Sequence, residues 1–323
     1  QLAEHGVAVA EALSDMAPDA QLYLATVNSL PDLRNAIDYF ASVGVKIISR
    51  SLGAPYDGPG DGTGESAKLI DYAVSKGIAW FNSAGNHGIR TEYGRRVGGY
   101  WRSKWIDAGN DGWLDFTDPT GNVGPSHYLP VTCGWFGGLR WNDWGQASAT
   151  DYNLFAYSAP SGTQVLLASS TNNQAAGARP LEGTDAVDAN GSTAFNRIDC
   201  TKYPYYYLAI QRNGPASPDE DILEIQVYLG LWDYPTMAGS AGQAFADTRN
   251  AGAAAVGAVD PVDGVTIAGY SSRGPSNDGR IKPDLSAGSG FASLSYPTGF
   301  NGTSAATPVV AGAAALVWQA APG

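Results

Sequence analysis

An apolar stretch at residues 301–318, NGTSAATPVVAGAAALVW, constrains the fold of this chain more than any other feature. Its second half carries no charge on any side, and a helix that is apolar all round is either buried in a large core or spans a membrane. The run 304–320 is interrupted by Thr307, Pro308 and Gln319 and is short for a membrane span. We therefore predict a central buried helix.

The start of this helix, Gly302-Thr303-Ser304, places hydroxyl groups at a helix N-terminus, where the macrodipole favours nearby negative charge. Pro308 lies within the first turns, where a missing N–H costs little. Ser and Thr are also common N-cap residues. Two interpretations are therefore open for Thr303 and Ser304, a helix cap or a reactive hydroxyl.

Residues 302–312, GTSAATPVVAG, resemble the nucleophile segment of the subtilisin-like serine proteases, the subtilases. The pattern of that family is Gly-Thr-Ser, a small residue or Met, Ala, Ser or Thr, Pro, and an apolar run with Ala-Gly. The resemblance implies that Ser304 is the nucleophile. It continues in family order over residues 1–89 and 240–323, through His5-Gly6, residues 17–27, residues 48–53, residues 83–88, residues 256–260 and residues 270–275.

The same resemblance implies roles for further residues. His5 matches the general base of the family, and imidazole suits this role because it titrates near neutrality. Asn86 matches the side-chain donor of the oxyanion hole, and its amide can donate a hydrogen bond to a developing oxyanion. Alternatively, a lone His on a helix is structural, and Asn86 is a left-handed turn residue. We interpret His87 as a surface or turn residue. The segments implied to bind substrate are the edge Ser51, Leu52, Gly53 and the pocket wall Ser83, Ala84, Gly85.

The sequence departs from the family at the third catalytic residue, an Asp at the end of a strand that precedes the His. Only Gln1 to Glu4 precede His5 here, and Glu4 is too close in sequence to fold back onto its imidazole. We therefore expect the catalytic Asp upstream of residue 1, and this chain as given to be weakly active or inactive. Residue 1 is Gln with no leader after it, which indicates a processed or excised piece. Only residues 14–16 stand where many subtilases insert a calcium loop, so no such site is expected there.

Helices and strands alternate in the first part of the chain. Helices are predicted at 5–15, from Ser29 to a stop at Gly44, and at 66–76, and apolar strands at 21–27, 45–51 and 78–84. Near-continuous apolar strands between helices are typical of a parallel sheet covered on both faces, with the ligand crevice at the carboxyl ends of its strands. The fold class is therefore α/β, a subtilisin-like parallel sheet in residues 1–89 and 240–323.

Residues 90–239 have a different pattern, with most of the Trp residues and no long helical period. Short β-rich runs between turn residues predict an inserted antiparallel β-sandwich. Residues 139–143 with 151–154 resemble the jelly-roll modules of secreted bacterial peptidases, which implies an accessory domain that contacts carbohydrate or protein, or a rigid prop. Cys133 and Cys200 both lie here, so a disulfide between them, which the sequence leaves open, would cross-link this region.

One loop of this region resembles a calcium-binding loop. Asp107, Asp111 and Asp115 stand at relative positions 1, 5 and 9, with Gly112 at position 6. Position 3 is Gly109 and no Glu stands at position 12, so a solvated turn is the favoured interpretation over a calcium site.

Composition narrows the function further. The chain has 19 basic and 31 acidic residues, which argues against nucleic acid and anionic membranes as partners. We expect a secreted serine endopeptidase that acts on polypeptides and requires no cofactor. The alternatives are an inactive binding or scaffold protein on a protease fold, against which the presence of Ser304, His5 and Asn86 weighs, and a glycan- or protein-binding protein that acts through the Trp-rich insert.

Overall fold

A four-stranded parallel sheet organises the first of two units into which the chain folds. The computed structural model describes residues 2–117, 126–145, 150–174, 178–184, 194–215 and 220–321. Unit 1 comprises residues 1–54, 60–86 and 241–323, and unit 2 comprises residues 55–59 and 87–240. The sheet of unit 1 has the strand order β1-β2-β12-β13. Its elements are α1 (Leu2–Met16), α2 (Leu30–Ser42), β1 (Ile47–Arg50), α3 (Glu65–Ser75), β2 (Ala79–Ser83), β12 (Ala253–Val259), β13 (Leu285–Gly288) and α4 (Thr303–Ala320).

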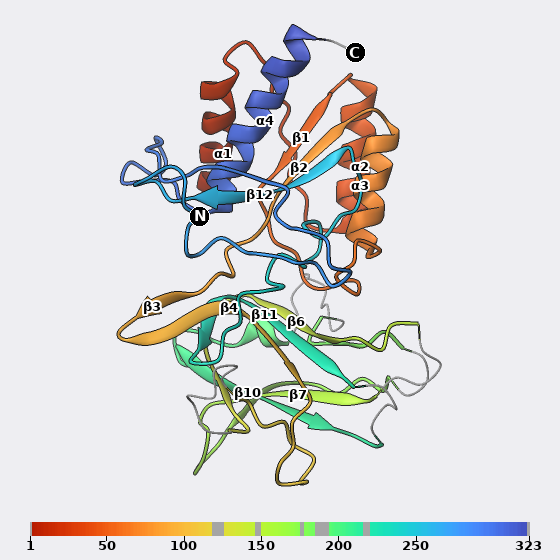
Figure 1. Cartoon of the computed structure of the whole chain (residues 1–323), viewed down its shortest axis with the longest axis vertical. Helices are drawn as coiled ribbons and strands as arrows, with labels where there is room; N and C mark the ends of the chain where they lie inside the picture. The colour runs from red at the N-terminus through yellow and green to blue at the C-terminus, as the bar shows by residue number, and fades with distance from the viewer. Residues whose placement is uncertain are drawn as a thin grey trace. The chain divides into compact units, whose positions relative to one another are not determined.

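Helices cover both faces of this sheet (Figure 1). On one face, α4 lies against the sheet, with Ala306 packed on Val256 and Ala258 of β12. On the other face, α2 and α3 bury Ile37 and Ile70 in a cluster that also holds Trp80 and Phe245. The expected mixed architecture with a parallel sheet is therefore present in unit 1.

Local sequence signals account for the ends of α2. The hydroxyl of Ser29 accepts a hydrogen bond from the backbone N–H of Asp32 at 3.2 Å, and Pro31 occupies the first turn, where it needs no N–H partner. Gly44 has a φ of 81° just past the helix, a conformation that glycine adopts without steric cost. Both predicted ends of this helix are confirmed.

The prediction that the apolar C-terminal helix is buried all round is wrong for its second half. Ala305, Ala306 and Ala311 are buried, whereas Leu316, Val317 and Trp318 are 43%, 68% and 41% exposed. The first half lies between the sheet and α1, but no described element covers the outer side of the second half. Apolar composition alone therefore overestimated the burial of this helix.

The strand predicted at residues 21–27 is also wrong. This segment has no regular secondary structure and pairs with no strand among the described residues, and Leu24 is mostly exposed. A strand needs a hydrogen-bonded neighbour, and β1 is an edge strand that pairs only with β2 in this part of the chain. Residues 21–27 thus have the apolar pattern of a strand but no neighbouring strand to pair with among the described residues.

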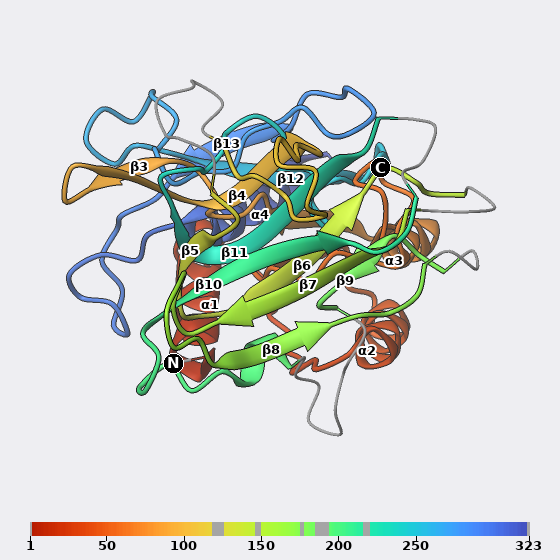
Figure 2. The same cartoon turned by 90° about the horizontal axis from the view of Figure 1, so that it is seen from below.

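Unit 2 is built on antiparallel strands that hydrogen bonds join into one nine-stranded sheet. Figure 2 shows β10, β7 and β8 side by side, in the order of their pairing, whereas β11 pairs with β4, β5 and β6 along its length. Because the hydrogen bonds connect all strands, the division into two packed layers of a sandwich stays a prediction. The strands are β3 (Arg90–Glu92), β4 (Arg95–Lys104), β5 (Leu129–Thr132), β6 (Phe136–Trp141), β7 (Tyr152–Tyr157), β8 (Leu166–Ser170), β9 (Leu181–Glu182), β10 (Tyr205–Arg212) and β11 (Ile222–Trp232), with a 3-10 turn at Phe195–Arg197.

A buried ion pair attaches residues 55–59 to this sheet. Arg140 of β6 donates to Glu224 of β11 at 2.7 Å and to the carbonyl of Gly58 at 3.2 Å, and both charged side chains are almost fully buried. Burial by itself raises the pKa of Glu224, but the charges of Arg140 and Arg102 and the hydrogen bonds from Arg140 and Tyr100 together lower that pKa below its ordinary value. Residues 55–59 therefore belong to unit 2, although the segments on both sides of them in the sequence belong to unit 1.

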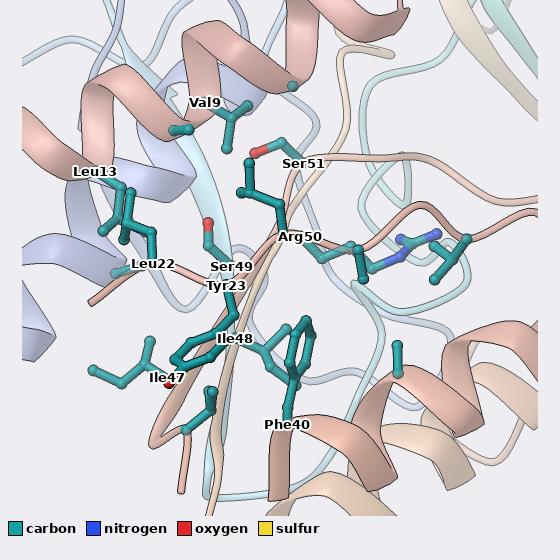
Figure 3. Close-up of a pocket in the computed structure, with 18 of the residues that line it drawn as sticks. Val9, Leu13, Leu22, Tyr23, Phe40, Ile47, Ile48, Ser49, Arg50 and Ser51 are labelled. Atoms are coloured by element: carbon teal, nitrogen blue, oxygen red, sulfur yellow. The ribbon is translucent and has the colours of Figure 1, made fainter. Parts of the chain in front are cut away.

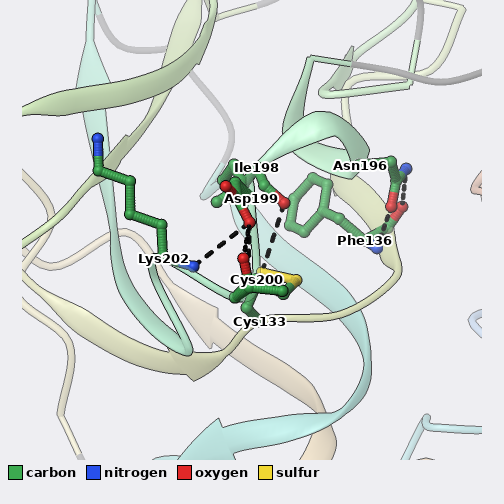
Figure 4. The surroundings of a disulfide bond; sticks show 8 residues. Cys133, Phe136, Asn196, Ile198, Asp199, Cys200 and Lys202 are labelled. Carbon is green, nitrogen blue, oxygen red and sulfur yellow. Dashed lines mark hydrogen bonds between the residues drawn. A yellow bond between two sulfur atoms is a disulfide. The ribbon is translucent and has the colours of Figure 1, made fainter.

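Cys133 and Cys200 form a disulfide in unit 2 (Figure 4). The bond spans 67 positions, so by chain entropy it stabilises the fold by about 4 kcal/mol. Beside it, the amide of Asn196 exchanges two hydrogen bonds with the backbone of Phe136 at the start of β6. The bond thus lies within the β-rich region, as the sequence predicted for any pairing of these cysteines.

His87 is buried, so its interpretation as a surface or turn residue is wrong. Only 4% of the side chain is exposed, and its Nε2 lies 3.2 Å from the amide nitrogen of Gln226 on β11. An amide nitrogen can only donate, so this imidazole nitrogen accepts and carries no proton. Burial lowers the pKa of His87 to about 4.

We expect unit 2 to lose stability as the pH falls from 6.5 to 4 because of His87. In this range the unfolded chain binds a proton at an imidazole of ordinary pKa 6.5 that the folded state, with a pKa of about 4, does not bind. At pH 4 this difference lowers the free energy of unfolding by about 3 kcal/mol. Urea unfolding followed by Trp fluorescence should therefore show a smaller loss for His87→Gln than for the parent, with the half-exposed His127→Gln as matched control. Equal acid sensitivity of the parent and His87→Gln would contradict this expectation.

None of the helices in the described ranges is both long and apolar enough to cross a membrane.

Candidate active site

The N-terminus of α4 is capped from another segment of the chain. The N-cap residue is Gly302, which has no side chain, and the N–H of Thr303 donates instead to Oδ1 of Asn86 at 2.9 Å. The interpretation of Thr303 or Ser304 as the cap is therefore wrong. The hydroxyl of Ser304 remains outside the capping interactions, in the first turn of the helix.

Ser304 faces the end of β1. Its hydroxyl donates to the carbonyl of Ser51 at 3.3 Å, and the hydroxyl of Ser51 donates to the carbonyl of Ser304 at 2.9 Å. This reciprocal pair joins the first turn of α4 to the carboxyl end of a parallel strand, where ligand crevices of such sheets lie. Ser304 itself is half-buried.

Asn86 is held in one orientation by Thr303. Its Oδ1 accepts hydrogen bonds from the Thr303 N–H and from the Thr303 hydroxyl at 2.9 and 3.0 Å. A backbone N–H can only donate, so the atom that faces it must be the amide oxygen, and Nδ2 points elsewhere. Asn86 does not have a positive φ, so its interpretation as a left-handed turn residue is wrong. The Nδ2 group donates to no acceptor within the described part of the chain.

Gly302 allows this close approach. It has a φ of 100°, and a Cβ at this position would lie 2.9 Å from Nδ2 of Asn86. A side chain would therefore be strained and would push against the amide.

His5 lies on α1 near the start of α4. Its ring makes an edge contact with Phe300 at 5.5 Å, and Ala8, one turn later, shares a buried cluster with Ala305. Burial lowers the pKa of His5 below its ordinary value, which favours the neutral imidazole that a general base requires. Within the described residues, however, His5 makes neither a hydrogen bond to Ser304 nor an ion pair with a carboxylate. Its position is fixed by packing alone.

The two predicted substrate segments differ in exposure. Leu52 and Gly53 are exposed beyond β1, but the guanidinium of Arg50 donates to their carbonyl groups at 2.7 and 3.4 Å. At the wall, the Gly85 N–H donates to the Thr303 hydroxyl at 3.1 Å, and its carbonyl accepts from Ser272. The remaining wall residues, Ser83 and Ala84, are buried. The carbonyl of Ser83 accepts a hydrogen bond from the amide of Asn82. Ala84 donates its N–H to the carbonyl of Val256 and accepts at its own carbonyl from the amide of Gln243.

The resemblance to the family did not predict the contacts that Thr303 and Arg50 make at the candidate site. Thr303 joins Gly85, Asn86 and α4 through its N–H and hydroxyl. Arg50 occupies the carbonyl groups of the substrate edge and stacks 3.8 Å from the ring centre of Phe245. A single charge at the end of the apolar strand IISR is the signal that could have identified Arg50.

An apolar groove of about 840 Å³ runs along the free edge of β1 (Figure 3). The extended segment 20–28 forms its opposite wall, and α1 and α4 contribute further sides, including Val9 and Trp318. Its lining includes His5 and Ser51, so the groove reaches the candidate site. The unpaired edge of β1 and the unpaired segment 20–28 are therefore both exposed to it.

The candidate calcium loop uses its carboxylates internally. Asp107 accepts from the N–H groups of Asp111 and Gly112, and Asp115 accepts from that of Ala108. His127 lies 3.5 and 3.2 Å from the carboxylates of Asp111 and Asp115. These contacts are those of an ordered turn, and in the described ranges no group of three or more His, Cys, Asp or Glu side chains is arranged to hold a metal.

Comparison with known proteins gives one family. The model of the subtilase family of S8 peptidases matches residues 140–323, a range that includes Ser304 but neither His5 nor Asn86. A search of curated proteins gave no match. Since the matched range is more than half of the chain, the chain belongs to the subtilase family of serine peptidases.

Proposed function

We propose that unit 1 hydrolyses peptide bonds through an acyl-enzyme, with Ser304 as nucleophile, His5 as general base and Asn86 as oxyanion donor. The main support is the pair of hydrogen bonds from Thr303, the chain neighbour of Ser304, to Oδ1 of Asn86, which leaves the donor group Nδ2 without an acceptor in the described part of the chain. The family implies a polypeptide substrate. Unit 2 then acts as an accessory domain, and its disulfide fits a secreted protein.

Each residue has a defined task in this reaction. The Ser304 hydroxyl attacks the substrate carbonyl while neutral His5 takes its proton, and His5 later returns the proton to the leaving amine. The tetrahedral oxyanion is bound by Nδ2 of Asn86 and by the backbone N–H of Ser304, which lies in the first turn and has no intrahelical acceptor. For attack, the Ser304 hydroxyl must exchange its bond to the Ser51 carbonyl for one to His5.

His5 needs an orienting carboxylate, and we assign this group to a strand in the groove beside β1. The edge of β1 and the segment 20–28 offer unpaired backbone groups on two sides of the groove, and the apolar lining suits a buried strand. Because the groove reaches His5, the carboxyl end of a strand parallel to β1 is able to place an Asp at the imidazole. Without this strand the chain is weakly active or inactive.

Labelling with a fluorophosphonate tests the assignment of the nucleophile. After long incubation we expect the label on Ser304, located by peptide mass spectrometry, and no label on Ser304→Ala. Ser51→Ala is the matched control, because it removes the neighbouring hydroxyl and should retain the label. A label that persists in Ser304→Ala, or its complete absence even when the groove is filled by an Asp-bearing strand, would favour an inactive scaffold instead.

A further inference from the structure

Two buried aspartates face each other at one end of the sheet of unit 2. Asp143 follows β6 and Asp221 precedes β11, and these strands pair antiparallel with Leu223 opposite Trp141. Continued by two residues, this register places Asp221 directly opposite Asp143. Like charges directly opposite in an antiparallel pair destabilise a sheet. The two side chains are only 1% and 5% exposed, so water does not screen them.

Each carboxyl group is half satisfied. Oδ2 of Asp143 accepts from the N–H of Thr150, and Oδ2 of Asp221 accepts from the hydroxyl of Tyr152, both at 2.7 Å. Both Oδ1 atoms are buried and have no hydrogen-bond partner within the described part of the chain. Neither carboxyl group forms an ion pair with a Lys or Arg in the described part of the chain. Burial is the main cause that raises the pKa of Asp221, and hydrogen bonds from Thr150 and Tyr152 act against it. The adjacent Asp143 carboxyl raises this pKa further through its charge and through a hydrogen bond between the two groups, as expected when two carboxylates share a site.

A third buried aspartate nearby, Asp151, differs from this pair in its hydrogen bonds. Asp151 is equally buried, but its two oxygens accept from the N–H of Gln174 and the amide of Asn213. Both oxygens of Asp151 thus accept hydrogen bonds, whereas Asp143 and Asp221 each keep one oxygen without a hydrogen-bond donor in the described part of the chain.

We propose that Asp143 and Asp221 bind a divalent cation of the calcium class between their Oδ1 atoms. The side chains of Thr150 and Tyr152, which hydrogen-bond to Asp221, offer hydroxyl oxygen atoms and no sulfur or imidazole, which is the chemistry of a hard cation. The cation replaces the like-charge repulsion with two attractions and joins the end of β6 to the start of β11. This site is separate from the loop at residues 107–115.

Thermal unfolding of the whole protein tests the site. Trp fluorescence reports mainly on unit 2, which contains seven of the nine Trp residues, with Trp101, Trp105 and Trp141 in or beside its core. Relative to protein kept in EDTA at neutral pH, calcium at a hundred times its Kd should raise the Tm by about 5–10 °C. Asp143→Asn and Asp221→Asn should each abolish this shift while remaining at least as stable as the parent in EDTA, because each removes one of the opposed charges.

Matched variants distinguish calcium at this pair from calcium bound at neighbouring carboxylates. Asp151→Asn and Asp107→Asn should both retain the calcium shift, whatever their basal Tm. Terbium provides a second signal, since Trp105 lies 5.0 Å from the ring of Tyr152 and can sensitise its luminescence, which should disappear in Asp143→Asn and Asp221→Asn. An unchanged Tm with calcium, together with stabilisation by Asp221→Asn, would show that the pair shares a proton and would overturn the proposal. So would a calcium shift that persists in both Asn variants.

Discussion

Supplying the groove beside β1 with an apolar strand that ends in Asp should accelerate labelling of Ser304 by about 3 × 10⁴-fold, the loss in turnover that removal of the triad Asp alone causes in subtilisin. The acceleration has two sources. The carboxylate orients His5, whose ring is now positioned only by packing on Phe300, and it stabilises the imidazolium that forms when Ser304 loses its proton. The strand can be added as an N-terminal extension that continues through Ser or Thr and Gly into residue 1.

The measurement is the second-order rate of fluorophosphonate labelling with and without the extension. The same extension ending in Asn is the matched control, because it fills the groove with equal volume but cannot carry the negative charge. A second control, Ile48→Lys, places a charge in the groove lining and should prevent the gain. Equally fast labelling with and without the extension, or equal acceleration by the Asp and Asn forms, would contradict the assignment.

Asn86→Asp should lower the turnover of the strand-completed protein by about 10²- to 10³-fold, the effect of removing one oxyanion donor. Asp keeps an oxygen for the Thr303 N–H and hydroxyl, so the cap on α4 survives and the added charge suits the helix N-terminus. It replaces Nδ2, the donor that we assign to the oxyanion, with a second carboxylate oxygen. The loss is therefore expected in kcat, with little change in Tm.

Two variants provide the comparison. Asn86→Ala loses the donor and the cap together, so it should show the same kinetic loss and also a lower Tm. Thr303→Val removes only the hydroxyl that bonds to Gly85 and Asn86, and it should cost less turnover than either. Full turnover in Asn86→Asp would exclude Asn86 as the oxyanion donor.

The elements of unit 1 that the sequence predicted correctly carry local signals. The helix after Ser29 has a capping side chain, an apolar stripe and a glycine stop, each encoded within a few residues. The strands at β1 and β2 are short apolar runs that find partners in the parallel sheet. By contrast, residues 21–27 carry the same apolar pattern but lack a partner strand, so the pattern alone predicted a strand that the structure does not contain.

Burial was predictable only where the covering elements were known. The apolar helix α4 is exposed at Val317 because no described element lies over that side, and composition cannot indicate such a gap. His87 shows the opposite error: it follows a polar turn in the sequence but is buried beneath Gln226, which is more than a hundred positions away. Both depend on contacts between segments distant in sequence.

The sequence alone determined the family and the candidate nucleophile, because the motif around Ser304 combines a helix start with a serine hydroxyl inside one short segment. Only the tertiary structure decided how the parts of the site are held. It placed the Asn86 oxygen on the Thr303 N–H, Ser304 against Ser51, and Asp143 opposite Asp221. The physical reason is that hydrogen-bond partners and like-charge contacts are set by distances of a few ångströms between remote segments, whereas a sequence motif specifies only which groups are available.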